Sequence, residues 1–282
     1  MKRWDQLTIR SSFIFSKIMR DRELCREMME VLLNRPVKGV SYPEEEKVID
    51  ITPDGKSVRL DVYVVDEEDH IYDMEMQAQE KWDLPERSRY YQGMIDLNLL
   101  EKGENYKSLP ESSVIFICTF DPFGVGRYVY TFENVCLEDS GIRLNDGTEK
   151  IFFNAAGREG EVGSRRKALL EYIGEDELSE DPLILRLDEA VRRAKNNEGW
   201  RREYMTFGMY LEEELMRGRE QGLEEGRAEG LEEGRAEGRR TGAASINALN
   251  RRLLADGRTE ELLRAVNDQE LQARLLKEYG LR

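Results

Sequence analysis

Hydrophobic and polar residues alternate in two short stretches in the first third of the chain, at residues 58–65 and 71–77. Alternation with a period of two is typical of a β-strand that has one buried face. The residues between the stretches, 66–70, are four acids followed by a histidine, which suits an exposed turn. The pattern therefore predicts a β-hairpin, and the polar side chains that share one of its faces are the first candidates for chemistry.

The turn sets the register of this hairpin. If Val65 pairs with Ile71, then Asp61 lies opposite Glu75, and directly opposed residues have Cβ atoms about 4.5–5.5 Å apart. Gln77 follows two residues later, on the same face as Glu75. Two carboxylates this close repel each other unless a cation lies between them, and a hard divalent cation such as Mg²⁺ takes oxygen ligands. The spacing leaves two interpretations open, a metal site or one solvated face of an acidic hairpin.

The remaining periodicities predict a mixed α/β fold. Apolar residues recur at helical spacing in residues 7–34, 84–101, 162–173 and 183–197. Further strands are predicted at residues 46–52, 113–120 and 127–136, with a hairpin that joins 142–144 to 150–153. We therefore expect a small mixed sheet flanked by helices, followed by a helical C-terminal tail.

Glycine recurs at every fourth residue of the tail, without a break from Gly218 to Gly242, and one eight-residue sequence occurs twice, at 223–230 and 231–238. Each glycine costs about 1 kcal/mol relative to alanine within a helix. Either a second helix approaches the glycine stripe closely and makes an oligomerisation stalk, or the repeat is a polar spacer whose stacked glutamates repel one another. The helical pattern upstream favours a long helix that is fully ordered only when it is paired.

These features divide the chain into four parts. Residues 1–157 form the core, 158–198 a helical extension, 199–242 the glycine-repeat helix or spacer, and 243–282 a small helical unit. The last part has 7 Lys and Arg against 6 Asp and Glu, so it is not notably basic. A packing or partner-binding module is favoured there over a DNA-binding helix-turn-helix.

Composition narrows the classes of function. The net charge of −15 includes −10 in residues 1–157, from 20 Lys and Arg and 30 Asp and Glu, whereas nucleic-acid enzymes commonly carry a basic patch. A phosphate backbone would need a local basic groove, for which the candidates are Arg20, Arg22, Arg26, Arg87 and Arg89. The single histidine, His70, argues against His-based triads and His-rich zinc sites. Without a signal peptide or a long apolar run, we expect a cytoplasmic protein with no membrane association.

The order of the motifs resembles that of the PD-(D/E)XK nuclease superfamily. The resemblance is carried by Arg59-Leu60-Asp61-Val62, then Met74-Glu75-Met76-Gln77, then Glu86-Arg87-Ser88-Arg89-Tyr90-Tyr91. The chain is similar to the transposase-like branch, the Rpn family of recombination-promoting nucleases, over roughly residues 1–155. The resemblance implies a restriction-endonuclease-like core and a metal-dependent DNA endonuclease, a hydrolase linked to DNA recombination or to transposon-like activity.

By the same resemblance, Asp61 and Glu75 hold the catalytic Mg²⁺, with Mn²⁺ as the alternative, and Met76 lends its backbone carbonyl. Gln77 stands where the motif has a lysine. That departure removes a positive charge that helps to activate water or to stabilise the transition state. Catalysis would then be weaker, or would depend more on the metal.

Three further residues enter only through the resemblance. Arg89 and Gln92 would contact substrate phosphates or brace the site, and Glu30 would present an acid from the first helix, although an ordinary surface carboxylate is the simpler interpretation of Glu30. The function predicted is a Mg²⁺-dependent endodeoxyribonuclease that binds DNA and forms homo-oligomers through a coiled coil of residues 199–242. The alternative is a nuclease fold with weak or no catalysis that serves as an interaction module, which the acidic charge and the missing lysine favour.

Overall fold

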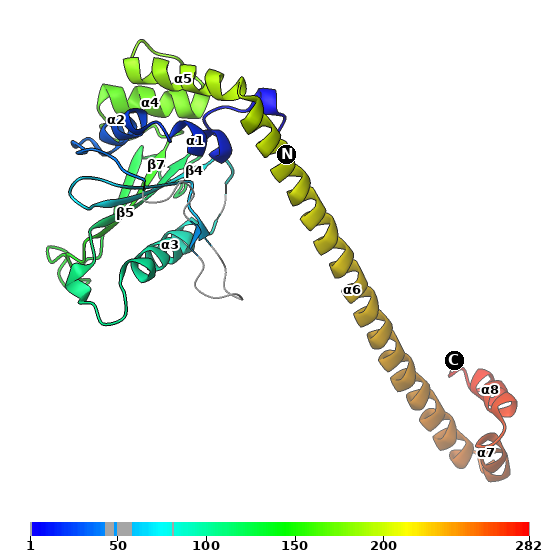
Figure 1. Cartoon of the computed structure of the whole chain (residues 1–282). Coiled ribbons are helices and arrows are strands. Elements are labelled where there is room, and N and C mark those ends of the chain that lie inside the picture. Colours follow the sequence, from blue (N-terminus) through cyan, green and yellow to red (C-terminus); the bar gives the residue numbers. More distant parts are fainter. Residues whose placement is uncertain (1, 43–47, 50–57, 81, 282) are drawn as a thin grey trace. The chain divides into compact units, whose positions relative to one another are not determined.

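A computed structural model describes residues 2–42, 48–49, 58–80 and 82–281 of the chain. The chain divides into two compact units, Met1–Thr206 and Phe207–Arg282. The first unit contains a five-stranded mixed sheet with helices on both faces (Figure 1). The predicted α/β class is confirmed.

Among the described residues, the elements of the first unit come in blocks, since helices precede four strands, two helices separate these from three further strands, and helices follow. Its helices are η1 (Trp4–Gln6), α1 (Ser12–Ile18), α2 (Arg22–Leu33), α3 (Leu84–Leu99), η2 (Tyr106–Ser108), α4 (Ser164–Glu175) and α5 (Pro182–Lys195). Its strands are β1 (Val48–Ile49), β2 (Val58–Arg59), β3 (Val62–Val65), β4 (Ile71–Gln77), β5 (Ser112–Cys118), β6 (Val129–Phe132) and β7 (Thr148–Asn154). Helix α6 (Glu198–Ala255) begins in the first unit and continues into the second, which adds α7 (Thr259–Ala265) and α8 (Gln269–Glu278).

The five strands lie in the order β3-β4-β5-β7-β6. Strands β4, β5 and β7 run parallel, and the two edge strands are antiparallel to their neighbours. Helix α3 makes the crossover from β4 to β5 that a parallel pair requires. Because β4 has a neighbour on each side and helices on each face, all seven of its residues are buried, including the polar Asp73, Glu75 and Gln77.

Two clusters of buried apolar side chains cover the two faces of the sheet. Helices α1, α2, α4 and α5 pack on one face, where Tyr72, Met74 and Met76 of β4 join their core. Helix α3 covers the other face, and Ile71 of β4 belongs to its cluster. The odd-numbered residues of β4 therefore face α3, which places the polar side chains of the strand beneath that helix.

The structure has two helices, α1 and α2, where the sequence predicts a single helix at residues 7–34. The carboxylate of Asp21 accepts a hydrogen bond from the main-chain N–H of Leu24 and so caps a new helix, α2. An N-cap aspartate satisfies an otherwise unpaired backbone donor and stabilises a helix start. The apolar periodicity continues across this break and concealed it.

The predicted hairpin of 142–144 with 150–153 is also wrong. Strand β7 pairs with β5 and β6 instead, and Arg143 makes an isolated bridge to Val135. Of the predicted strand 46–52, residues 48–49 form β1 and the others lie outside the described residues.

The second unit is helical, and α6 runs through the whole glycine repeat. Apart from the neighbouring backbone of α6 itself, a Cβ atom added at any glycine from Gly218 to Gly242 would meet no atom within 4 Å. Beyond the repeat, a small apolar core joins α6 to α7 and α8, and Gly257 ends α6 with a positive φ of 75°. Among the described residues, no helix combines the length and the apolar composition that crossing a bilayer requires.

Candidate active site

The hairpin of β3 and β4 has the predicted register, since Val65 pairs with Ile71. Asp61, one residue before β3, therefore meets Glu75. The main-chain N–H of Asp61 donates to Oε1 of Glu75 over 2.9 Å, and the main-chain N–H of Met76 donates to Oδ2 of Asp61 over 3.2 Å. Each carboxylate is thus held by the backbone segment that carries the other.

A bend places Asp61 outside the regular strand. The predicted strand 58–65 divides into β2 and β3 at Leu60 and Asp61. The side chain of Leu60 is buried in the cluster beneath α3, whereas Asp61 is half-buried. Glu75, by contrast, is 3% exposed. The pair therefore combines one enclosed carboxylate with one nearer to solvent.

Arg87 of α3 reaches back to β4 and contacts the polar residues near its C-terminal end. Its Nη1 donates to Oε1 of Gln77 over 2.9 Å, and its Nη2 donates to Oε2 of Glu75 over 3.4 Å and to the hydroxyl of Tyr91 over 2.8 Å. The guanidinium also lies over the ring of Phe116, 5.5 Å from its centroid. Because a guanidinium only donates, the amide oxygen of Gln77 must face Arg87 and its NH₂ group points elsewhere. Arg87 thus brings a positive charge to Gln77, where the motif has a lysine.

Burial makes the carboxyl groups of the site hard to ionise. Burial raises the pKa of Glu75 well above its usual range, and the charges of Asp61 and Asp73 raise it further. The pKa of Asp73 is likewise raised, first by burial and then by Asp61. Arg87 opposes both shifts. A cation bound among these groups would offset the same repulsion.

Asp73 provides a test of whether the site fits a metal ion. It is fully buried, and neither of its carboxyl oxygens has a hydrogen-bond partner among the described residues. An unpartnered buried acid is costly unless it is neutral or near a cation. Asp61 and Glu75 offer the carboxylate oxygens that hard divalent cations require. Asp73 adds a third acid nearby, but within the described part of the chain no three His, Cys, Asp or Glu side chains group closely enough to hold one metal ion together. The fit to a metal therefore rests on Asp61, Glu75 and a main-chain oxygen, with Asp73 outside the set of ligands.

Gln92 lies inside the protein and contacts residues other than the acidic pair. Its Nε2 donates to Oγ of Ser112 over 2.7 Å and to Oδ1 of Asp96 over 2.9 Å. Its own Oε1 has no partner among the described residues. Gln92 therefore braces α3 against β5, and a role in contacting substrate stays a prediction.

Glu30 makes its described contacts within α2 and the segment that follows it. Its Oε1 accepts from the main-chain N–H of Val37 over 3.1 Å, and its Oε2 lies 2.9 Å from Nη1 of Arg26. These contacts explain Glu30 as a structural acid. Arg26, one of the cations proposed for a basic groove, is engaged by the same pair.

The sequence patterns did not point to Asp73 or Tyr91 as residues of the site, and they indicated Arg87 only as a candidate for a basic groove. Each carried a signal. Asp73 precedes Glu75 by two residues and so shares its strand face. Arg87 and Tyr91 are four residues apart on a helix and so share a helix face.

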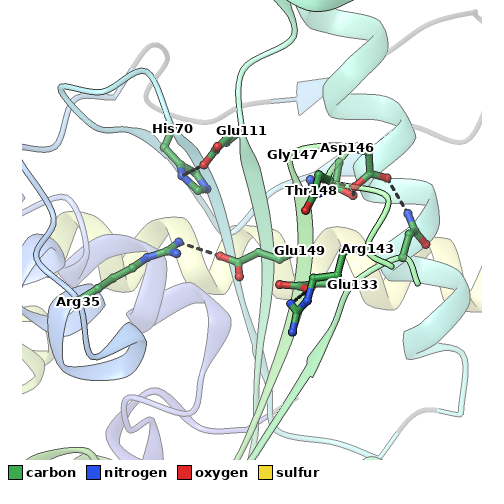
Figure 2. A pocket seen from close by; sticks show the side chains of 11 residues that line it. Arg35, His70, Glu111, Glu133, Arg143, Asp146, Gly147, Thr148 and Glu149 are labelled. Carbon is green, nitrogen blue, oxygen red and sulfur yellow. Dashed lines mark hydrogen bonds and ion pairs between the residues drawn. The ribbon is translucent and has the colours of Figure 1, made fainter. Parts of the chain in front are cut away.

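A polar pocket of about 280 Å³ lies at the N-terminal ends of β5 and β7 (Figure 2). The ion pairs Arg35–Glu149 and Arg143–Glu133 line it, and Nδ1 of His70 lies 3.5 Å from a carboxylate oxygen of Glu111. The sequence predicts an exposed turn at His70, but the residue is half-buried. Its Nε2 lies 2.9 Å from Oγ of Ser113, and its ring stacks on Tyr72. Arg35 and Arg143 are thus paired with acids, Asp146 accepts a hydrogen bond from the neutral Asn134, and Gln77 is at the other end of β4.

A family model matches the part of the chain that contains this site. The model of a family described as PD-(D/E)XK nuclease family transposase matches residues 13–157, just over half of the 282 residues. The matched range contains Asp61, Glu75, Gln77 and Arg87. No curated protein and no solved structure matches the chain.

Proposed function

Because this chain belongs to the PD-(D/E)XK nuclease family of transposases, we propose that it is a metal-dependent endonuclease that hydrolyses the phosphodiester bonds of DNA. One observation carries the proposal, the reciprocal main-chain hydrogen bonds of Asp61 and Glu75 between β3 and β4. These bonds hold two carboxylates side by side on a rigid part of the sheet. Their mutual repulsion favours the binding of a cation between them.

Each residue of the site has its own role in the proposed reaction. Asp61, Glu75 and the backbone carbonyl of Met76 hold the metal, for which we propose Mg²⁺, with Mn²⁺ as its substitute. When bound, a divalent cation supplies a Lewis acid that polarises a phosphodiester oxygen. Gln77, whose amide oxygen is held by Arg87, turns its NH₂ group to orient the attacking water. Arg87 places a fixed positive charge where negative charge develops on the phosphate.

We also propose that α6 joins copies of this chain into a homo-oligomer. The space beside each glycine from Gly218 to Gly242 is open, so a second helix can approach the backbone closely. Leu223 and Leu231, one from each copy of the repeat, are 66% and 58% exposed and gain from being covered. The assignment to the Rpn family, the link to DNA recombination and a cytosolic location rest on the resemblance of the motifs and on composition.

A second candidate function is an interaction module that keeps the nuclease fold without strong catalysis. A specific observation favours it, because both carboxylate oxygens of Glu75 already accept hydrogen bonds, one from the N–H of Asp61 and one from Arg87. A carboxylate satisfied in this way needs no metal. The two candidate functions predict different effects of replacing Asp61 and Glu75 on DNA cleavage.

Cleavage of a supercoiled plasmid by the purified full-length protein separates them. The protein is incubated with Mg²⁺, with Mn²⁺ or with EDTA, beside the isosteric double variant Asp61→Asn/Glu75→Gln and the control Glu86→Gln, an exposed acid in the first turn of α3. We expect metal-dependent nicking that falls by at least about 100-fold in the double variant, as the loss of metal ligands should cost no less than the loss of their outer partners. Equal rates in wild type and double variant, or no cutting by folded protein in either metal, would establish the interaction module instead.

A further inference from the structure

A pocket of about 320 Å³ opens between the first turns of α3 and the edge of the sheet formed by β6 and β7. Its lining is largely apolar, unlike that of the polar pocket, with which it shares Glu133, Asn134 and Thr148. The side chains that define it are Arg89, Phe123, Phe132, Asn134, Lys150 and Phe152. The site proposed for catalysis uses none of them.

Three phenylalanine rings form the wall of this pocket. Phe152 is buried and meets Phe132 edge to face, with centroids 5.7 Å apart and planes at 89°. Phe123 lies 5.1 Å from each of the other two. These contacts fix the ring of Phe132, which is nevertheless 44% exposed. A rigid aromatic ring that remains open to solvent is the surface on which nucleobases stack.

The charge of the pocket is positive, in contrast to the acidic chain. Arg89 is exposed and Lys150 is half-buried, and in the described part of the chain neither forms an ion pair within 4.0 Å, although Lys150 is near enough to Asp96 to favour the charged form of that carboxylate. The one acid among the described lining residues, Glu133, is paired with Arg143. Two cations beside an aromatic wall are complementary to a nucleotide, which has a flat base and an anionic phosphate.

We propose that this pocket binds one unpaired base of the DNA strand on which the enzyme acts, stacked on Phe132, while Arg89 and Lys150 hold the adjacent phosphates. The inference rests on the proposed nuclease function and specifies its substrate. The volume is at the lower end of the range for small-molecule sites, which suits a single base. Single-stranded or locally opened DNA is therefore the preferred substrate, since a base inside a continuous duplex cannot enter.

The position of the pocket fits a strand that also reaches the acidic pair. Strand β7 is the second neighbour of β4 in the sheet and β6 the third. Adjacent strands are about 4.8 Å apart, so the strands of Phe152 and Phe132 lie roughly 10 Å and roughly 14 Å from the strand of Glu75. Helix α3 serves both places. Arg87 and Arg89 are two residues apart, about 200° around the helix axis, so one can approach β4 while the other faces the pocket.

Fluorescence anisotropy in EDTA tests the proposal without any need for cleavage. The full-length protein is titrated into a labelled single strand of about 12 nucleotides, within the range of sites that single-strand binders cover, and into the duplex of the same sequence. We expect tighter binding of the single strand, and binding about 5- to 150-fold weaker in Phe132→Ala, the loss expected for one stacked base. Phe132→Leu, which keeps an apolar side chain without the ring, should show a similar loss and guards against unfolding of the alanine variant.

Matched controls come from residues outside the pocket. Tyr106 is an exposed aromatic residue and Lys102 an exposed cation, and neither lines the pocket. Arg89→Ala should reduce the salt dependence of binding, the slope of log K against log[salt], by about 0.7, the value for one phosphate contact on a single strand. Tyr106→Ala and Lys102→Ala should match wild type.

The outcomes that overturn the proposal are distinct from a failure of the nuclease. Equal binding by Phe132→Leu and Tyr106→Ala, or equal binding of single strand and duplex, refutes a base pocket even in a protein that cuts DNA. Binding of labelled deoxyadenosine monophosphate that depends on Phe132, by a protein with no affinity for the labelled strand, would refute it in favour of a free-nucleotide site. Binding that depends on Phe132 in a protein that cuts nothing would leave the pocket standing and remove only the catalysis.

Discussion

Replacement of Arg87 by methionine removes a cation that contacts Glu75 and Gln77 of β4. Methionine keeps much of the apolar stem but deletes the guanidinium that contacts Glu75, Gln77 and Tyr91. The side chains of Arg87 and Glu75 are 18% and 4% exposed. Water therefore cannot replace the lost partner, and a charge on Glu75 would remain buried and uncompensated.

The size of the loss follows from this burial. Breaking a buried ion pair by removing one partner costs about 3–5 kcal/mol. The long separation of 3.4 Å between Nη2 of Arg87 and Oε2 of Glu75 places this pair at the lower end. Protonation of Glu75 limits the loss further, because its pKa is already raised by burial. We expect the free energy of unfolding near pH 8 to fall by about 3 kcal/mol in Arg87→Met.

The sign of the pH dependence follows from the same pKa shifts. Glu75 and Asp73 have folded-state pKa values above their unfolded values. The folded chain therefore binds more protons between these values, and stability falls as the pH rises through that window. Arg87 lowers both pKa values, so its removal extends the window upward. The variant should lose most near pH 8 and recover much of the difference near pH 5.

Urea unfolding followed by tryptophan fluorescence in EDTA measures this effect. All three tryptophans, Trp4, Trp82 and Trp200, lie in the unit Met1–Thr206, so the signal reports on the unit that contains the site. Arg89→Met is the matched control, because Arg89 is exposed and should change stability by less than about 0.5 kcal/mol. A loss in Arg87→Met of under about 1 kcal/mol near pH 8, or one equal at both pH values, would refute the electrostatic account.

Two other substitutions test features outside the acidic site. Burial, with a contribution from Arg35, lowers the pKa of His70. The unfolded chain therefore takes up a proton more readily than the folded chain, and stability falls as the pH drops below about 6.5. In urea unfolding, His70→Asn should flatten this dependence of stability on pH, and an unchanged dependence would contradict the assignment. In α6, Gly226→Ala with Gly234→Ala meets no steric obstacle and should stabilise the helix by about 1 kcal/mol per site, seen as a higher midpoint of thermal unfolding by circular dichroism. Weaker self-association of that variant in sedimentation equilibrium would indicate close helix contact, and unchanged association would exclude it.

The register of the hairpin could be predicted because two features of the sequence, the alternation of apolar residues and the length of the turn, both restrict it. A shift of one residue would turn Val62 and Val64 to the wrong face of the sheet. The pairing of Val65 with Ile71 agrees with the alternation and with the turn length, and the structure has this pairing. The pairing of β7 could not be predicted in this way. The Asn145-Asp146-Gly147 sequence favours a local hairpin, whereas the strand is buried by a parallel partner, β5, more than 30 residues earlier in the chain. Long-range burial outweighed a local turn preference.

The charge that completes the site shows why one position cannot be interpreted alone. Gln77 in place of a lysine suggested a weakened or lost activity, but the side chain of Arg87, ten residues later, occupies the space beside it. The four-residue spacing of Arg87 and Tyr91 indicates that they share a helix face. That face meets β4 only because the buried side chains of Leu84, Met94 and Ile95 pack α3 on the sheet. The same docking directs Arg89 to the aromatic pocket. The missing lysine and the acidic composition therefore weigh less against a nuclease than they did in the sequence, since α3 brings Arg87 to the acidic pair and Arg89 to the aromatic pocket.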